Sequence, residues 1–315
     1  MSVRRRWASA AVGAAGVIAL GALTAPAATA ATALPSARAV PAATTASGWA
    51  PAASAAIHPG VVTETAGGGS CTANFVFTSG DRTFIGQAGH CGGTGAETET
   101  NGCTSASVPL GTAVTIKGSD GRARKGTLVY SSWLTMQQLR ETDPDTCAFN
   151  DFGLVEIDRA DVADVNPSLP FFGGPQGIDT DGMQPGETVF SYGNSPLRAG
   201  ISTLGPKVGI SAGDIGHGHG HVVYTLTPGI PGDSGSAYLD GSGDAVGLLS
   251  TLNLAPLPVS NGVADLAKAL VYANANGGLG DIELALGTEP FTATPVGVPL
   301  IALATPAGPP LPPVS

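Results

Sequence analysis

Between residues 57 and about 290 the chain is divided into short apolar runs by clusters of Gly, Pro, Asn and Asp. With 46 Gly and 25 Pro among 315 residues, turn-forming residues are too frequent for long helices to dominate. Such spacing is typical of strands in a sandwich or in β-barrels, so we predict an all-β fold. The runs cover residues 74–77, 82–85, 112–116, 126–130, 152–157, 188–192, 222–226 and 245–249.

One late segment has helical spacing instead. Apolar residues recur every three or four positions from Asn261, and Asn276-Gly277-Gly278 ends the pattern. We therefore predict a C-terminal helix over residues 261–276. Beyond it, residues 291–315 contain a proline every few positions, which forbids an unbroken membrane helix and indicates a flexible tail.

The N-terminus has the features of an export signal. Three arginines at positions 4–6 precede an uncharged stretch over residues 7–23, and Ala28-Thr29-Ala30 fits a cleavage site. A transmembrane anchor is the alternative, but the apolar run is shorter than the roughly 20 residues that a span needs. We expect a signal peptide over residues 1–30, a linker or short pro-segment over 31–56, and a secreted protein free of the membrane.

Charge and cysteine content limit the possible partners. The formal net charge of −10 makes the chain a poor phosphate binder, so we expect no nucleic-acid partner. Four cysteines in an exported chain imply two disulfides, and the sequence alone allows three pairings. Because no Cys-x-x-Cys spacing occurs, we expect no structural zinc and no cofactor.

Three short motifs carry residues suited to catalysis. Gly235 follows Ser234, and Gly232 lies two residues before it, so the backbone can turn sharply and its N–H groups can converge. His90 follows an apolar run and precedes Cys91, and a histidine has a pKa suited to a general base. Asp151 begins another apolar run, where a carboxylate can orient a histidine. Each motif alone also fits an ordinary turn, a packed histidine or a strand-entry cap.

The order of these residues along the chain separates the known triad folds. No histidine follows Ser234, which excludes the α/β-hydrolase order for this nucleophile. The subtilisin order needs an aspartate well before the histidine, and only Asp81, in a turn close by, precedes His90. The order His90, Asp151, Ser234 remains, which is that of chymotrypsin.

The chain resembles the bacterial, actinobacterial-type branch of the chymotrypsin-like serine peptidases over residues 57–290. The resemblance rests on Ala-Gly-His-Cys at 88–91, Asn-Asp-Phe-Gly-Leu at 150–154 and Gly-Asp-Ser-Gly-Ser at 232–236. It implies two antiparallel six-stranded β-barrels with a C-terminal helix, and a triad in the crevice between them. It also implies an endopeptidase acting on proteins or peptides, with Gly232 and Ser234 supplying the oxyanion hole. We expect the protein to be a monomer.

The resemblance extends to the surroundings of the triad. It places Pro228 at the floor of the primary pocket, with Ser250, Thr251 and Leu252 on its wall, so we expect cleavage after uncharged, mainly apolar residues. Asp233 is expected to be buried against a new N-terminus or an arginine, with Arg198 as the candidate. For the disulfides we predict the pairs Cys71–Cys91 and Cys103–Cys147.

Two alternatives remain open at the level of sequence. A catalytically silent binding module and a secreted esterase are both compatible with the same fold. Separately, His217, His219 and His221 alternate at strand spacing and could bind zinc or copper on one side, or could belong to a solvated glycine-rich loop. Because the sequence places no acid or cysteine to complete such a site, we expect no metal.

Overall fold

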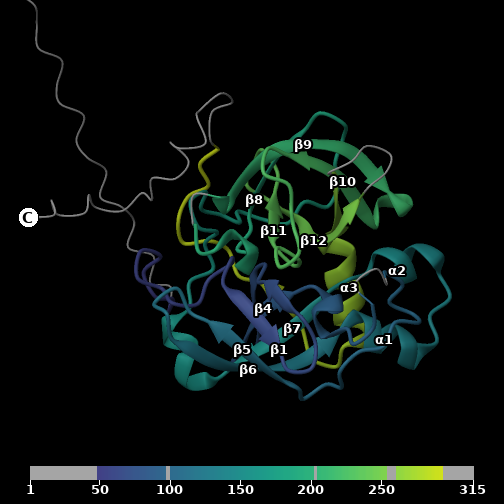
Figure 1. Cartoon of the computed structure of the whole chain (residues 1–315), viewed down its shortest axis with the longest axis horizontal. Helices are drawn as coiled ribbons and strands as arrows, with labels where there is room; N and C mark the ends of the chain where they lie inside the picture. The colour runs from purple at the N-terminus through teal and green to yellow at the C-terminus, as the bar shows by residue number, and fades with distance from the viewer. Residues whose placement is uncertain (1–47, 97–99, 202–203, 254–259, 294–315) are drawn as a thin grey trace, which may run out of the picture. The chain divides into compact units, whose positions relative to one another are not determined.

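A computed structural model describes residues 48–96, 100–201, 204–253 and 260–293. The predicted signal peptide, most of the predicted linker and residues 294–315 of the predicted tail lie outside these ranges. Within the described ranges, no helix has the length and apolar character needed to cross a membrane. The described residues form two β-sheets and three α-helices, with the first sheet below the second in Figure 1.

The first sheet has eight antiparallel strands in the order β14-β3-β4-β7-β6-β5-β1-β2. The predicted hairpin is present, because β3 pairs with β4 through the turn at Gly80, whose φ is +61°. The strands are β1 (Val62–Thr65), β2 (Ser70–Thr72), β3 (Val76–Ser79), β4 (Arg82–Gln87), β5 (Ala113–Lys117), β6 (Ala123–Ser131), β7 (Gly153–Ile157) and β14 (Glu283–Leu284).

The second sheet is a closed six-stranded barrel in the order β10-β13-β12-β11-β8-β9. All its pairings are antiparallel, as expected for a chymotrypsin-like barrel. Its strands are β8 (Thr188–Tyr192), β9 (Pro206–Ile215), β10 (Gly220–Thr225), β11 (Ala237–Leu239), β12 (Ala245–Asn253) and β13 (Ser260–Asp265).

Among the described residues the first sheet has eight strands where six were expected, and the two at its edges, β14 and β2, are short. At the β2 edge the N–H of Thr72 donates to the carbonyl of Ser234 at 2.8 Å, in the other half of the molecule. This edge of the sheet therefore contacts the turn that carries the predicted nucleophile.

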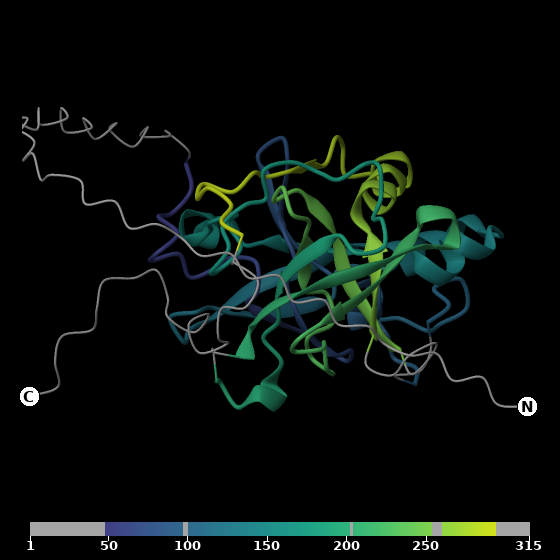
Figure 2. The same ribbon diagram turned by 90° about the horizontal axis from the view of Figure 1, so that it is seen from above.

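The three α-helices gather at one end of the sheets in both ribbon views (Figures 1 and 2). Helix α1 (Ser132–Leu139) and helix α2 (Pro144–Phe149) were not predicted from the sequence. Helix α3 (Leu266–Asn276) confirms the C-terminal helix but begins five residues later than predicted. Residues 260–265 instead form β13, and the side chain of Asp265 caps the first turn of α3.

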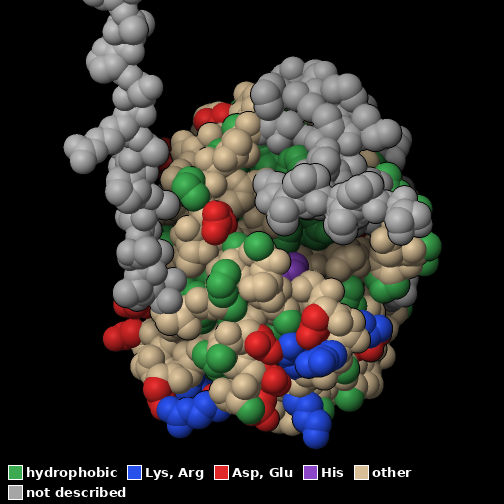
Figure 3. Space-filling view, turned by 90° about the vertical axis from the view of Figure 1, so that its left-hand side faces the viewer, with side chains coloured by type: hydrophobic (Ala, Val, Ile, Leu, Met, Phe, Trp, Pro, Cys, Tyr) green, Lys and Arg blue, Asp and Glu red, His purple; other side chains and the backbone are tan. Residues whose placement is uncertain are grey.

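Aromatic side chains of the first sheet belong to a core that also includes residues of the second sheet, such as Phe190. Phe77, Phe84 and Phe152 are fully buried, and the rings of Phe77 and Phe152 meet edge to face at 5.4 Å. Few charged side chains are buried, and Asp151, Lys207 and Asp233 are among them. On the face shown in Figure 3, acidic and basic side chains are interspersed over the lower part, at the height of the first sheet.

Candidate active site

Strand pairing brings His90 and Asp151 together. Strands β4 and β7 are neighbours, with Gln87 opposite Gly153. His90 follows β4 in the short 3-10 turn Gly89–Gly92, and Asp151 lies just before β7. The Nδ1 atom of His90 lies 2.7 Å from Oδ2 of Asp151, and the backbone N–H of His90 donates to Oδ1 at 2.8 Å. Both carboxylate oxygens therefore hold the histidine.

Both members of this pair have shifted pKa values. Burial alone would lower the pKa of His90, but the Asp151 carboxylate outweighs it and raises that pKa. Burial alone would likewise raise the pKa of Asp151, but His90 lowers it, assisted by the Ser250 hydroxyl, which donates to Oδ2 at 2.6 Å. The carboxylate stays ionised and keeps the proton on Nδ1, which leaves Nε2 able to accept one.

Ser234 lies in a turn that requires glycine on both sides. Gly232 and Gly235 have φ values of +92° and +87°, in the region that favours glycine. A Cβ on Gly235 would come within 2.6 Å of the Thr72 carbonyl oxygen, and one on Gly232 within 2.9 Å of Ser195. The predicted flanking glycines are thus needed both for conformation and for space.

The predicted oxyanion donors face the same cleft as the histidine. Within the part of the chain that the structure describes, the N–H groups of Gly232 and Ser234 have no hydrogen-bond acceptor. Both residues line a cleft that His90 and Asp151 also line. Among the described residues there is no hydrogen bond between Ser234 and the His90 ring, and such bonds are often long in ligand-free enzymes.

Asp233 is fully buried and contacts two cations. Arg198 donates to Oδ2 through Nη2, Lys207 Nζ lies 3.0 Å from the same oxygen, and the N–H of Ser195 donates to Oδ1 at 2.9 Å. Burial alone would raise the pKa of Asp233, but the two cations lower it. The predicted pairing with Arg198 is confirmed. Lys207, whose pKa burial lowers to about 8, is a second cation that the sequence did not reveal.

The cleft has a volume of about 660 Å³. One wall is formed by residues 229–231, which precede the nucleophile turn, and the other by residues 249–252 of β12. The three predicted pocket residues on β12 line the cleft. Pro228 does not belong to the lining, which begins at Gly229. The carbonyl of Pro228 accepts instead from Arg198 at 3.2 Å, behind the wall.

Other residues that line the cleft were not indicated by the sequence. Residues 67–71 and 93–96 line it, together with Trp133 from α1. The Trp133 ring lies 6.3 Å from the His90 ring between centroids, so it borders the predicted base directly. Trp133 was missed because α1 was not predicted, and its tryptophan could have been the signal, being one of three in the chain.

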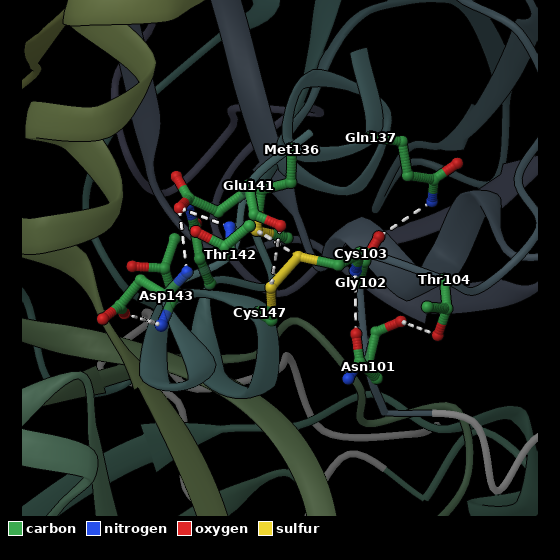
Figure 4. Close-up of a disulfide and its surroundings, with 12 residues drawn as sticks. Asn101, Gly102, Cys103, Thr104, Met136, Gln137, Glu141, Thr142, Asp143 and Cys147 are labelled. Atoms are coloured by element: carbon green, nitrogen blue, oxygen red, sulfur yellow. Dashed lines mark hydrogen bonds between the residues drawn. A yellow bond between two sulfur atoms is a disulfide. The ribbon is translucent and has the colours of Figure 1, made fainter. Parts of the chain in front are cut away.

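Both predicted disulfides are present. Cys71–Cys91 joins the middle of β2 to the turn that carries His90. Cys103–Cys147 joins the loop after residue 100 to α2, as Figure 4 shows. Gln137 of α1 donates to the carbonyl of Gly102 at 2.8 Å beside this disulfide. The second disulfide thus braces the loop that continues from the cleft wall at residues 93–96.

The three alternating histidines do not face one side. Residues Gly216–Gly218 form a 3-10 turn rather than a strand, and His217 has a φ of +50°. Nδ1 of His217 contacts Asp145 of α2 at 2.5 Å, and Nδ1 of His219 contacts the Gly216 carbonyl at 2.8 Å. His221 is fully buried. The strand spacing predicted for the segment is therefore wrong at its first two histidines.

One group of potential metal ligands lies close together among the described residues. Sulfur and nitrogen atoms of Cys71, His90 and Cys91 are within 4.8 Å of one another. The two sulfurs are bonded to each other in a disulfide, so neither can act as a thiolate ligand. Cysteine must be deprotonated and free to hold a metal, and this group therefore fits no metal site.

Solved structures with a similar fold are serine proteases. Protease A of Thermobifida fusca is 21% identical, over 74% of this chain and 100% of that one, with a TM-score of 0.45. A protease of Nocardiopsis is 19% identical, over 72% and 98%, with a TM-score of 0.40. A Glu endopeptidase is 19% identical, over 69% and 91%, with a TM-score of 0.46. No family model and no curated protein matches the sequence.

Proposed function

We propose that the chain is a secreted serine endopeptidase with a His90–Asp151–Ser234 triad. One observation carries the proposal. One cleft is lined by a histidine that both oxygens of a buried carboxylate hold and by a serine at a glycine-flanked turn. Two residues of the same lining have N–H groups without protein acceptors within the described residues. That combination of nucleophile, base, orienting acid and oxyanion donors is what acyl transfer requires.

The reaction proceeds through an acyl-enzyme. Ser234 Oγ attacks the peptide carbonyl carbon while His90 Nε2 takes the hydroxyl proton, and the N–H groups of Gly232 and Ser234 hold the oxyanion. The C–N bond then breaks, and His90 returns its proton to the leaving amine. Water repeats the sequence on the ester, giving its proton to His90 and releasing the new carboxylic acid and the Ser234 hydroxyl.

We also propose that the protein is extracellular. Two disulfides persist outside the reducing cytosol, which supports an extracellular location for a chain with an export-type N-terminus. We propose that the protein acts as a monomer on proteins or peptides. The cleft wall at Ser250, Thr251 and Leu252 carries no charge, which supports cleavage after uncharged, mainly apolar residues.

Covalent labelling tests the proposal. The secreted protein is treated with a fluorophosphonate, the labelled residue is identified by mass spectrometry, and hydrolysis of a peptide library is measured. We expect labelling at Ser234, hydrolysis by the wild type, and loss of both in Ser234→Ala. The matched control is Ser242→Ala, an exposed serine in the turn after β11.

The outcomes separate the alternatives. A protein that is folded but unlabelled is a binding module, and the peptidase proposal is then wrong. A protein that labels at Ser234 and hydrolyses esters but no peptide is an esterase. Labelling at a residue other than Ser234 contradicts the triad assignment.

A further inference from the structure

Asn261 connects the two walls of the cleft. It is fully buried, belongs to β13, and lines the cleft. Its Oδ1 accepts from the N–H of Gly229 at 2.7 Å, and its Nδ2 donates to the carbonyls of Gly229 at 3.3 Å and Thr251 at 3.2 Å. One side-chain amide thus joins the wall at 229–231 to the wall at 249–252.

There is little space beyond this amide. A Cβ on Gly229 would lie 2.6 Å from Cδ2 of Leu249 and 3.0 Å from Nδ2 of Asn261, so even a methyl group there would displace one of these side chains. The two walls are therefore packed together at this depth, with Asn261 between them. A substrate side chain that enters between the walls must end at the amide.

The amide is neutral and its donors are used. Both N–H bonds of Nδ2 point to wall carbonyls, so none is free for an acidic substrate side chain. Behind the wall at Pro228, the side chains of Arg198 and Lys207 donate to its carbonyl at 3.2 and 3.4 Å. A basic substrate side chain would approach two buried cations whose carboxylate partner, Asp233, is already engaged by both, and it would lose its hydration at a cost in free energy.

We propose that Asn261 sets the depth of the primary specificity pocket and restricts cleavage to sites after short uncharged residues such as Ala and Val. This inference rests on the proposed peptidase function. It narrows the expected class from uncharged apolar residues in general to those whose side chains end before the amide. Asn261 acts here as a specificity-determining residue that contacts the substrate side chain and takes no part in bond breaking.

The test compares matched peptides that differ only in the residue before the scissile bond, namely Ala, Val, Leu, Phe, Lys and Glu. The value of kcat/KM is measured for the wild type, Asn261→Ala and Asn261→Ser, each normalised to the fraction labelled by a fluorophosphonate. The matched control is Asn274→Ala. Asn274, on α3, also uses both ends of its amide, accepting from the N–H of Ile282 at 2.7 Å and donating to its carbonyl at 3.1 Å, but lies outside the cleft lining.

We expect the wild type to prefer Ala and Val over Phe by about tenfold or more, the scale at which a pocket rejects extra methylenes. Removing the amide should raise the Phe-to-Ala ratio of kcat/KM by about tenfold, whereas Asn274→Ala should leave that ratio unchanged. A labelled Asn261→Ala protein with the wild-type ratio overturns the proposal. A wild-type preference for Phe, Lys or Glu also overturns the proposal, and this result can be obtained even if neither Asn261 variant folds.

Failure of the proposed function has a different signature. A wild-type protein that labels at Ser234 but cleaves none of the peptides is not a peptidase. The same series is then measured as thioesters of each amino acid, whose acyl part enters the same pocket. The ratio of Phe to Ala thioester turnover in the wild type and in Asn261→Ala decides the depth of the pocket independently.

Discussion

His221 Nε2 lies 3.2 Å from Oδ2 of Asp265, and the other oxygen of that carboxylate accepts from the N–H of Lys268 at 2.7 Å, in the first turn of α3. On its other side, Nδ1 of His221 lies 2.7 Å from Asp214 Oδ1, which also accepts from the N–H of Met183. A buried imidazole therefore joins β9 to the start of α3. With a carboxylate at each nitrogen, the ring is arranged to carry two protons.

This arrangement predicts a stability that falls as pH rises. Burial alone would lower the pKa of His221, but Asp265 and Asp214 outweigh it and raise the pKa above 6.5. The contribution of His221 is thus fully present below pH 6.5 and is lost as pH rises through its pKa in the folded protein. We expect His221→Gln to destabilise the protein by about 1–3 kcal/mol at pH 6 and by less at pH 9.

Thermal unfolding of the wild type and His221→Gln between pH 5 and 9 checks this prediction. The quantity that decides is the gap between the two unfolding free energies. A gap that is constant or widens toward high pH shows that His221 is neutral in the folded protein. A gap that closes as pH rises shows the expected protonated ring.

Replacing Asp151 with Asn should alter both the rate and its pH dependence. Because Asp151 raises the pKa of His90, kcat/KM of the wild type should rise with pH through a pKa above 6.5. Asp151→Asn removes that charge, so the apparent pKa should fall and the rate should drop by about 10⁴-fold. The measurement is kcat/KM against pH on one peptide substrate. If a folded, labelled variant shows an unchanged apparent pKa on the low-pH side of the kcat/KM profile, Asp151 does not have this role.

The buried group around Asp233 should behave as a unit. Lys207→Met leaves the carboxylate with one cation fewer and should cost about 3–5 kcal/mol of stability, as when one partner of a buried pair is removed. Asp233→Asn should be costly for the same reason. The double variant should cost clearly less than the sum of the two, because once Asp233 is neutral the loss of Lys207 removes a buried cation that has no partner. Denaturant unfolding of the four proteins measures this coupling, and strict additivity would show that Lys207 and Asp233 do not interact.

The two disulfides should differ in their effect on activity. Cys103→Ser with Cys147→Ser opens the longer loop, with a sequence separation of 44, and should cost about 2–4 kcal/mol of stability. Cys71→Ser with Cys91→Ser should also slow fluorophosphonate labelling, because Cys91 is bonded directly to His90 in the chain. Labelling rates and unfolding curves of both variants check the contrast. Equal labelling rates in the two variants would count against it.

The sequence revealed the parts of the site that sit at the ends of clear apolar runs. His90 and Asp151 follow from the runs that became β4 and β7, and strand pairing then set their contact. Both disulfide pairings and the contact of Asp233 with Arg198 were also predicted correctly. The disulfide pairs were predicted alongside the family resemblance, since the cysteines alone left three pairings open, and the contact of Asp233 follows from the need of a buried carboxylate for a cation.

Other features depend on tertiary contacts that no local pattern records. Residues 260–265 are buried on both faces, so β13 has no alternation and its apolar residues merge with the helical spacing that follows. Helix α2 is short, and its stability comes from the Asp143 cap and the disulfide at Cys147. Asn261 and Lys207 acquire their roles only when distant strands place acceptors around them.

Thr72 belongs to the first sheet, yet its hydroxyl donates to the Gly232 carbonyl at 2.8 Å and its N–H donates to the Ser234 carbonyl. The peptide groups that shape the nucleophile turn of the second half are therefore oriented by a residue from the first. In a chimaera, exchanging the second barrel alone would therefore separate the nucleophile turn from the residue that orients it. A second half transplanted onto another first half would arrive with its turn unsupported unless the recipient supplies a threonine or serine at the equivalent of Thr72.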